Sequence, residues 1–286
     1  MPSVPQSDPL SERQRVARQV GQALAVLPHV SAVLVFGSVA SGHVDDRSDI
    51  DLLVVCEQLP EPEERRLLLS RLGEGPSLGS PSGDPMFPIV DEVPLVGGVP
   101  VTLHYQLAVW VEQVLDEVIG QGALTTTQLP FRPYTLAGLI QQALVLEDKK
   151  GEVAGWRARI AVFPSALKQN LLAHFAPLLK EQVAELTANA ERRLGPRVLL
   201  FNLNWAVDAL VGLLYALNEV YDPADRRAEH TIWPYFQIAP QNFSGRLKEV
   251  LEGPFDHVTA IGKARLFEAL ALEVLVEVER VVRSSN

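Results

Sequence analysis

The pattern of apolar and polar positions divides the chain into a first part with strands and helices and a later part with helices alone. Four short apolar runs, rich in β-branched residues, predict strands: Val30–Phe36, Ile50–Cys56, Ile89–Val96 and Val99–Tyr105. The last two flank Gly97-Gly98, a pair typical of a two-residue hairpin turn. Pro94 and Pro100 cannot donate hydrogen bonds to a neighbouring strand, so we expect this hairpin to lie at a sheet edge.

Helical periodicity fills the gaps between these strands. Asp8-Pro9 matches an N-cap followed by a proline at the first helical position, and it predicts a helix that continues to about Leu27. Residues 60–72 and 108–119 also have helical spacing, whereas residues 73–88 are dense in Gly, Pro and Ser and predict a surface loop. The order of these elements predicts an α/β (α+β) domain with a small mixed sheet.

The pattern changes after residue 128. Five segments with helical spacing and few strand signals follow: Leu136–Glu147, Ser165–Arg193, Arg197–Tyr221, Phe243–Glu252 and His257–Arg283. Gly195-Pro196 marks a turn between two of them. We therefore predict two domains, residues 1–128 with the mixed sheet and residues 129–286 as an all-α antiparallel helical bundle.

Composition restricts the class of protein without indicating a function. Apolar residues make up 47% of the chain and charged residues 21%, which is typical of a globular, well-cored protein. The single cysteine, Cys56, rules out a disulfide and a thiolate metal site, and its place in an apolar run predicts a buried thiol. The amino terminus lacks the pattern of a signal peptide, and no uninterrupted apolar stretch reaches the roughly 18 residues of a membrane span. We therefore expect a soluble, cytoplasmic protein without a membrane partner.

The charge of the chain is unevenly distributed. Residues 1–128 contain 7 arginines, no lysine and 17 acidic residues, so the whole net charge of −10 belongs to this part. An acidic surface repels a phosphate backbone, which disfavours nucleic acid as the main partner. It favours metal cations and cationic small molecules, although a solvated acidic surface explains the same counts.

The loop between the first two predicted strands holds the residues that indicate chemistry. It begins with Gly37-Ser38, and after ten further residues Asp49 and Asp51 stand at the start of the second strand. Residues two apart on a strand share a face, so these carboxylates suit Mg²⁺, which proteins often hold with one or two carboxylates and substrate phosphates. Glycine lets the backbone approach a phosphate, and N–H groups at the start of a helix can bind it. The spacing therefore predicts a metal-dependent phosphate site.

The segment GSVASGHVDDRSDIDLLVV, which begins at Gly37, resembles the signature of the nucleotidyltransferase superfamily, as in the kanamycin, streptomycin and lincosamide nucleotidyltransferases and the minimal antitoxin-type members. The resemblance implies a small mixed-sheet catalytic domain that uses Mg²⁺ (or Mn²⁺) with an NTP as co-substrate. It implies that Asp49 and Asp51 bind the metal and act in catalysis. It also implies that Gly37 and Ser38 form the phosphate-binding turn, and that Ser48, which family members also carry, lies at the nucleotide.

Members of this family usually have a third metal-binding carboxylate on a later strand, where this chain has Thr102 and His104. If the hairpin is regular, Asp91 lies opposite His104 on the face of the two aspartates, and we predict Asp91 as the third, catalytic carboxylate. A one-residue shift of register would place Glu92 there instead. A solvated hairpin end without any third carboxylate is the remaining alternative.

The predicted bundle supplies further candidates. An NTP is strongly anionic and residues 1–128 have no lysine, so we expect cations from the bundle, with Arg226 and Arg227 binding the nucleotide. Asp208 lies on an apolar helix and is our candidate for the base that activates the acceptor hydroxyl. The arginines are equally well explained as surface residues, and Asp208 as a satisfied polar group of the core.

Together these features predict a Mg²⁺-dependent nucleotidyltransferase that transfers a nucleoside monophosphate from an NTP, such as ATP, to a hydroxyl of a small, aminoglycoside-like acceptor. The NTP and that acceptor would be its partners, and neither nucleic acid nor membrane is expected. Two alternatives stay open. Thr102 and His104 favour a catalytically weakened nucleotide-binding or interaction module, and the antitoxin-type relatives suggest an enzyme that nucleotidylates a protein. The sequence does not determine the oligomeric state.

Overall fold

The chain consists of two compact units. The computed structural model describes residues 8–73, 75–124, 132–256 and 258–284. The first unit comprises residues 1–162 and the second residues 163–286. The expected boundary between residues 128 and 129 lies outside the described residues, and the first unit continues well beyond it.

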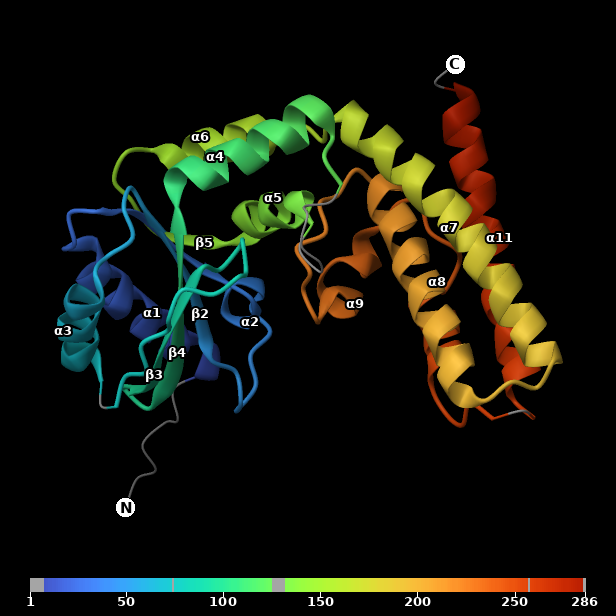
Figure 1. Ribbon diagram of the computed structural model, residues 1–286, viewed down its shortest axis with the longest axis horizontal. Coiled ribbons are helices and arrows are strands. Elements are labelled where there is room, and N and C mark those ends of the chain that lie inside the picture. Colours follow the sequence, from blue (N-terminus) through green and yellow to red (C-terminus); the bar gives the residue numbers. More distant parts are fainter. Residues whose placement is uncertain (1–7, 74, 125–131, 257, 285–286) are drawn as a thin grey trace. The chain divides into compact units, whose positions relative to one another are not determined.

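The first unit is built on a five-stranded mixed sheet with the strand order β3-β4-β2-β1-β5 (Figure 1). Its strands are β1 Val30–Phe36, β2 Ile50–Cys56, β3 Ile89–Val96, β4 Val99–Leu107 and β5 Leu144–Asp148. β2 and β4 run parallel, and the other neighbouring pairs are antiparallel. The first four strands confirm the predicted runs. β3 lies at one edge of the sheet, as the prolines in the hairpin predicted.

A fifth strand replaces part of an expected helix. Residues 136–147 have helical spacing, but α5 covers Pro133–Gln142 and β5 follows it directly. β5 pairs antiparallel with β1, so residues beyond 128 complete the sheet instead of starting the bundle. A short apolar run suits a helix and a buried strand equally well, and the neighbouring β1 decides between them here.

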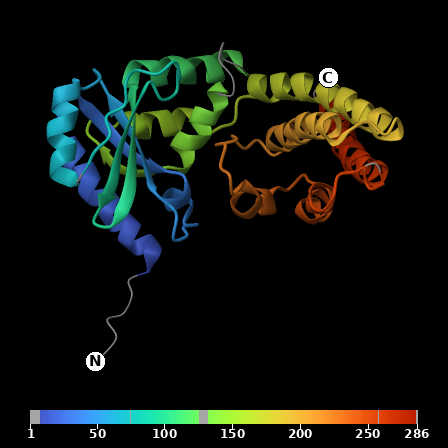
Figure 2. The same ribbon diagram turned by 60° about the horizontal axis from the view of Figure 1, so that its bottom comes forward.

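Helices cover both faces of this sheet. α1 Pro9–Ala25 and α3 Pro62–Leu72 lie on one side and α5 on the other (Figure 2). As predicted, Asp8 is the N-cap of α1, and its Oδ2 accepts a hydrogen bond from the backbone N–H of Ser11 (3.3 Å). Three helical segments contact α5: α4 Ala108–Asp116, the π-helix η1 Glu117–Gln121 and α6 Glu152–Ile160.

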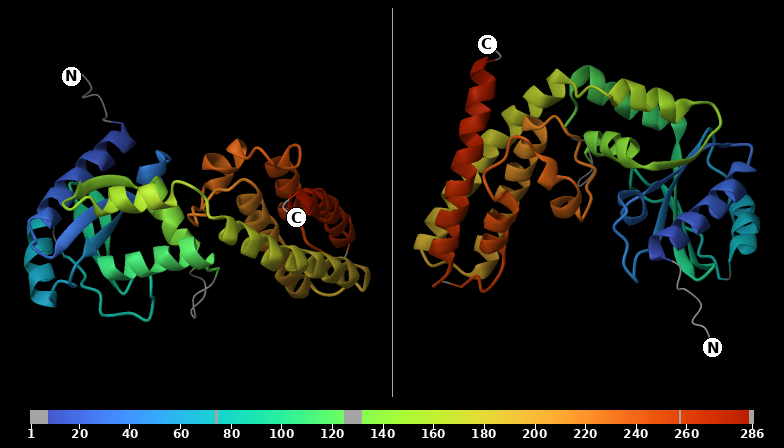
Figure 3. Two further views of the ribbon diagram at one scale, coloured as in Figure 1. Left: turned by 90° about the horizontal axis from the view of Figure 1, so that it is seen from above. Right: turned by 180° about the vertical axis from the view of Figure 1, so that it is seen from behind.

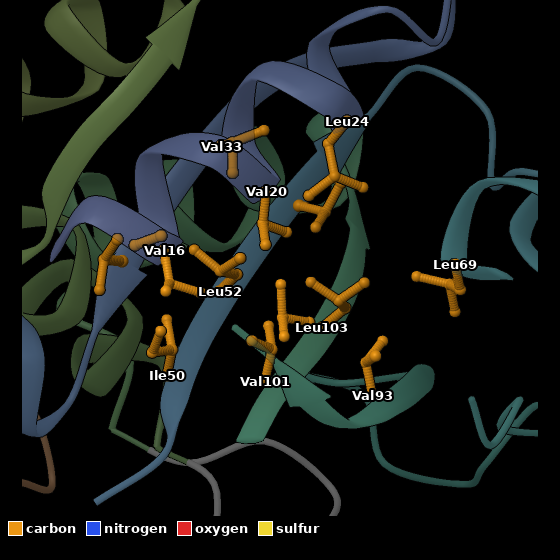
Figure 4. Packing of buried hydrophobic residues seen from close by; sticks show 14 of the residues in the cluster. Val16, Val20, Leu24, Val33, Ile50, Leu52, Leu69, Val93, Val101 and Leu103 are labelled. Carbon is orange, nitrogen blue, oxygen red and sulfur yellow. The ribbon is translucent and has the colours of Figure 1, made fainter. Parts of the chain in front are cut away.

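The main core of the first unit lies between α1, α3 and one face of the sheet (Figure 4). Alternate strand residues point into it, among them Val33, Ile50, Leu52, Val93, Val101 and Leu103. Because side chains alternate along a strand, Asp51 and His104 belong to the opposite face. Cys56 is part of this core, and burial raises the pKa of its thiol to about 12, so the thiol stays protonated and inert.

The second unit is a helical bundle (Figure 3). The long helices α7 Ser165–Glu191 and α8 Pro196–Leu217 form a hairpin, and α11 Ala260–Ser284 packs against both. Three shorter segments complete the unit: α9 Ala228–Thr231, the 3₁₀ helix η2 Trp233–Tyr235 and α10 Phe243–Leu251. These elements confirm the predicted long helices, and residue 257, the expected start of the last one, lies outside the described residues.

α8 corrects the expectation that no stretch has the length of a membrane span. Among the described helices it is the one that is long and apolar enough to cross a membrane by length and composition. It contacts both α7 and α11, and more than half of its most apolar window is buried. A helix covered on several sides carries apolar residues around its whole circumference, so packing in the bundle explains its composition.

Candidate functional site

The site begins where β1 ends. Gly37 has φ 69° and ψ −144°, a backbone conformation that strongly favours glycine, and it is the N-cap of the one-turn helix α2 Ser38–Ser41. A Cβ atom on Gly37 would lie 3.1 Å from Asp51 Oδ2. The backbone turn and this carboxylate therefore face each other across the space that the missing side chain leaves open.

The pairing of β1 with β2 brings the predicted aspartates to this turn. Phe36, the last residue of β1, is the cross-strand partner of Asp51. Asp49 directly precedes β2, and both aspartates are half-buried. Their spacing of two residues places them on the same side of the strand. The pairing thus brings Asp51 to Gly37, and the role of Asp49 beside it stays a prediction.

Ser38 is the first residue of α2. Its carbonyl oxygen accepts hydrogen bonds from Ser41 Oγ (3.2 Å) and from the backbone N–H of His43 (3.0 Å), which fixes the turn. No residue in the described part of the chain hydrogen-bonds the Ser38 hydroxyl, and the residue is half-buried. Its position next to Gly37 is consistent with the predicted phosphate contact.

Ser48 orders the loop that leads into β2. Its hydroxyl accepts a hydrogen bond from Asp45 N (2.9 Å) and donates one to Asp45 Oδ1 (3.0 Å). Its carbonyl accepts a hydrogen bond from Nε of the buried Arg13 on α1 (2.8 Å). Sequence reasoning missed Arg13, whose signal is an arginine on the apolar face of a helix. Ser48 therefore has a structural role, and its expected contact with the nucleotide stays a prediction.

The register of the hairpin differs from the regular one. The turn pairs Val96 with Val99 as expected, but the next pair is Val93 with Val101, so β3 holds one extra residue in between. Such a bulge shifts every later pair by one position and exchanges the two faces of the strand. Pro94 lies in this stretch and cannot donate a ladder hydrogen bond, which favours a bulge at that point.

Because of the bulge, the prediction that Asp91 is a third catalytic carboxylate is wrong in its geometry. Asp91 pairs with Leu103 instead of His104, faces the core and is completely buried. It forms an ion pair with Arg65 of α3 and accepts a hydrogen bond from Gly79 N (2.9 Å). Burial raises the pKa of Asp91, and the Gly79 N–H and the Arg65 guanidinium oppose that rise. Asp91 therefore anchors α3 and a loop to the sheet.

In the shifted register, Glu92 instead of Asp91 lies on the face of the sheet that carries Asp51. It pairs with Thr102, which in turn pairs with Asp51, so the three residues form a row across β3, β4 and β2. The Cα atoms of Glu92 and Asp51 are therefore two strand spacings apart, about 10 Å. Glu92 is exposed, and its function as a third metal ligand stays a prediction.

His104 contacts Asp51 directly. Its Nε2 lies 3.3 Å from Asp51 Oδ1, within hydrogen-bond distance. The imidazole packs against Phe36 and Phe87, with ring centroids 5.1 Å and 4.3 Å away. Nδ1 is buried without a hydrogen-bond partner in the part of the chain that the structure describes. From the sequence, His104 was notable only because family members have an acidic residue in this strand, and its contact with Asp51 was not predicted.

The donor set at this site suits one hard divalent cation. Asp49 and Asp51 offer the carboxylate oxygens that Mg²⁺ prefers, and the space beside Gly37 is one that a Cβ atom would fill. No cluster of three or more His, Cys, Asp and Glu side chains that could hold a metal occurs among the described residues. Substrate phosphates can add ligands to such an ion.

The remaining predicted residues lie in the second unit. Asp208 is half-buried on α8, Arg226 is exposed, and Arg227 is half-buried at the start of α9, where its N–H donates to Asp225 Oδ1 (2.9 Å). The contribution of these side chains to the nucleotide site stays a prediction.

The first unit contains lysines after all, because it extends beyond residue 128. Lys149 and Lys150 follow β5, and the N–H of Lys149 donates to the carbonyl of Ser31 (2.9 Å) near the start of β1. Lys150 forms an ion pair with Glu57. Gly37 follows the other end of β1, so neither lysine lies at the Gly37-Ser38 turn.

Comparison with known proteins agrees with this geometry. Residues 19–79 match the family model described as "Polymerase beta, Nucleotidyltransferase", and the matched part includes Gly37, Asp49 and Asp51. This match confirms, over these residues, the resemblance drawn from the motif. No curated protein matches the chain. Among solved structures, a nucleotidyltransferase-like protein from Exiguobacterium sibiricum 255-15 is similar at 12% identity and a TM-score of 0.40, over 95% of this chain and 80% of that one.

Proposed function

We propose that the chain is a Mg²⁺-dependent nucleotidyltransferase that transfers a nucleoside monophosphate from an NTP, such as ATP, to a hydroxyl of a small acceptor in the cytoplasm. The observation that carries the proposal is the opposition of Gly37 and Asp51. A turn that only glycine favours lies against a carboxylate, so close that a Cβ atom on Gly37 would be 3.1 Å from Asp51 Oδ2. The domain match over residues 19–79 supports the general reaction.

In this reaction the oxygen of the acceptor hydroxyl bonds to the α-phosphorus of the NTP, and the bond from that phosphorus to pyrophosphate breaks. The hydroxyl proton passes to a base, for which Asp208 is the candidate, and pyrophosphate leaves. A bound divalent ion supplies positive charge at the phosphate oxygens. Asp49 and Asp51 would hold that ion, the N–H groups of the Gly37-Ser38 turn would bind phosphate, and the bundle arginines would neutralise the remaining charge.

Charge supports a small, cationic or hydroxyl-rich acceptor. Residues 1–162 contain 20 acidic and 12 basic residues, so the unit with the motif is the acidic one. An acidic surface attracts cationic small molecules and repels a nucleic-acid backbone. An aminoglycoside-like acceptor combines positive charge with several hydroxyls and fits both requirements.

The test is the release of pyrophosphate, screened over the four NTPs and over acceptor classes. We expect Asp49→Asn combined with Asp51→Asn to reduce the release by about 10²–10³-fold or more, because both ion ligands lose their charge. The same pair of changes should abolish the Mg²⁺-dependent rise in Tm that a non-hydrolysable NTP produces.

Asp46→Asn is the matched control, because Asp46 is an exposed acid of the same loop. It should leave both the pyrophosphate release and the shift in Tm unchanged. If the double variant behaved like this control, Asp49 and Asp51 would not be the metal ligands and the proposal would fail.

A second function, a nucleotide-binding module without turnover, is favoured by the contact between His104 and Asp51. A protein of this kind would show the Mg²⁺-dependent shift in Tm but release no pyrophosphate with any acceptor. The same screen therefore separates it from the transferase.

A further inference from the structure

We propose that Arg13 of α1 is a positioning residue for the metal site, because it holds the backbone directly before Asp49 and so restricts where that carboxylate lies. Arg13 acts through Asp49 and is not itself a ligand of the ion. The inference rests on the proposed function, in which Asp49 binds the divalent ion. It concerns a contact between α1 and the loop before β2, which both belong to the first unit.

Arg13 is buried on the face of α1 that packs against the core. It is 7% exposed, and Val16 and Val20 lie on the same face of the helix. A long basic side chain usually keeps its charged end in water. Here Nε donates to the carbonyl of Ser48 (2.8 Å), and Nη1 donates to the carbonyl of Pro9, one turn earlier in the helix (3.3 Å). The guanidinium is therefore bound both to its own helix and to the loop.

The bond to Ser48 bears directly on Asp49. The carbonyl of Ser48 belongs to the same peptide unit as the backbone nitrogen and the Cα atom of Asp49, and this unit is planar. A donor that holds the carbonyl oxygen therefore also restricts the Cα from which the Asp49 side chain starts. On the other side of Asp49, Ile50 begins β2 and pairs with Val101 of β4. The backbone of Asp49 is thus held by Arg13 before it and by the sheet after it.

The hydrogen bonds within the loop fix its shape but do not connect it to α1. The N–H of Ser48 donates to the carbonyl of Asp45 (3.1 Å), and the N–H of Arg47 donates to Asp45 Oδ1 (2.9 Å). Val44, which precedes this turn, packs against the core. The bond from Arg13 meets the turn at its other end, directly beside Asp49. We therefore expect its loss to displace Asp49 more than the rest of the loop.

The charge of Arg13 has an effect of the opposite sign, which makes the two effects separable. Unlike Arg65, Arg13 forms no ion pair with a carboxylate among the described residues, and its hydrogen bonds go to carbonyl oxygens. A positive charge near a cation site weakens cation binding, so removing it without any other change would tighten that binding. Losing the positioning of Asp49 would weaken it instead. A neutral residue at position 13 therefore distinguishes the two effects by the direction of the change.

The experiment measures the affinity for Mn²⁺ alone by electron paramagnetic resonance, in the full chain without nucleotide. We expect Arg13→Met to bind Mn²⁺ about tenfold more weakly than the wild type, as is usual when a residue that orients a metal ligand is lost. Arg13→Lys should fall between the two, because its ammonium can still donate to a carbonyl but lacks the planar guanidinium. Arg18→Met is the control: it removes the same charge from an exposed position of α1 and should keep the wild-type affinity.

A second comparison tests whether the effect passes through Asp49. In an Asp49→Asn background, Arg13→Met should cause no further loss of Mn²⁺ affinity, because the carboxylate that it positions is absent. A general disturbance of the fold would weaken binding in both backgrounds. Urea unfolding of each variant shows which of them are folded, and Arg13→Lys serves as the test if Arg13→Met does not fold.

Three results would overturn the inference: wild-type or tighter Mn²⁺ binding in folded Arg13→Met, an equal loss in Arg18→Met, or the same further loss in the Asp49→Asn background. The proposed function fails separately. If Asp49→Asn alone left Mn²⁺ binding unchanged, Asp49 would not be a metal ligand, whatever Arg13 does. If Asp49→Asn weakened binding and Arg13→Met did not, the metal site would stand and the positioning role of Arg13 would be wrong.

Discussion

At the residue scale, Gly37 is constrained both by its backbone conformation and by the side chain of Asp51 beside it. Its φ of 69° with ψ −144° is a backbone conformation that side chains disfavour, and the carboxylate of Asp51 lies where a Cβ would point. Gly42, at the other end of α2, has φ 77° and ψ 8°, an ordinary left-handed conformation that asparagine also adopts. The two glycines therefore differ in what a substitution would disturb.

We expect Gly37→Ala to lower the free energy of unfolding by about 1–3 kcal/mol, through backbone strain, and to displace the carboxylate of Asp51. Binding of a non-hydrolysable NTP should weaken about tenfold or more, since each 1.4 kcal/mol changes Kd by that factor. Gly42→Asn is the control and should keep near-normal binding. Calorimetric titration and thermal unfolding measure both effects, and wild-type affinity in Gly37→Ala would contradict the role of the turn.

At the scale of elements, the bulge in β3 determines the direction in which two adjacent acidic residues, Asp91 and Glu92, face. Asp91 faces the core, and Glu92 lies on the face of the sheet that carries Asp51. Asp91 is completely buried and paired with Arg65, whereas Glu92 is exposed in the row with Thr102 and Asp51. A buried charge whose partner is removed is strongly destabilising, whereas an exposed one is not. We therefore expect removal of the charge to destabilise the fold at Asp91 but not at Glu92.

Asp91→Asn should lower the free energy of unfolding by about 3–5 kcal/mol, because it leaves the Arg65 guanidinium buried without a counter-charge. Glu92→Gln, the matched control, should leave the midpoint of urea unfolding unchanged. Urea denaturation followed by circular dichroism measures both. A stable Asp91→Asn protein that binds NTP but has lost turnover would instead restore Asp91 as a catalytic residue.

At the scale of the whole molecule, the sheet determines where the first unit ends. β5 supplies the antiparallel neighbour of β1, and α5 and α6 contact β1 as well. A chain that ends at residue 128 lacks all three elements and leaves the edge of β1 without its partner, which favours aggregation. A chain that ends at residue 162 retains the whole compact unit.

We expect the fragment 1–162 to unfold cooperatively on heating and the fragment 1–128 to remain unfolded or to aggregate. Circular dichroism with a thermal ramp distinguishes the two results, and cooperative unfolding of 1–128 would contradict the assignment of β5. The folded fragment also tests Arg226 and Arg227, which it lacks: if it bound an NTP analogue as tightly as the full chain, these arginines would not be part of the nucleotide site.

The sequence by itself determined the local features of this protein. The β-branched runs of β1 to β4, the Asp8-Pro9 start of α1 and the long bundle helices follow from periodicity and capping, which act between near neighbours. The motif from Gly37 to Asp51 is also local, because its turn and its carboxylates stand on consecutive strands. Chemical identity and spacing were therefore enough to find it.

Tertiary structure alone decided the features that depend on pairing between distant segments. The run at 144–148 becomes a strand because the edge of β1 is open to it, and the bulge beside Pro94 turns Asp91 toward Arg65. The contact of His104 with Asp51 exists only because β4 runs parallel to β2 in one register. Local propensity carries no information about register, since a shift of one residue changes no residue type and yet reverses which side chains face the site.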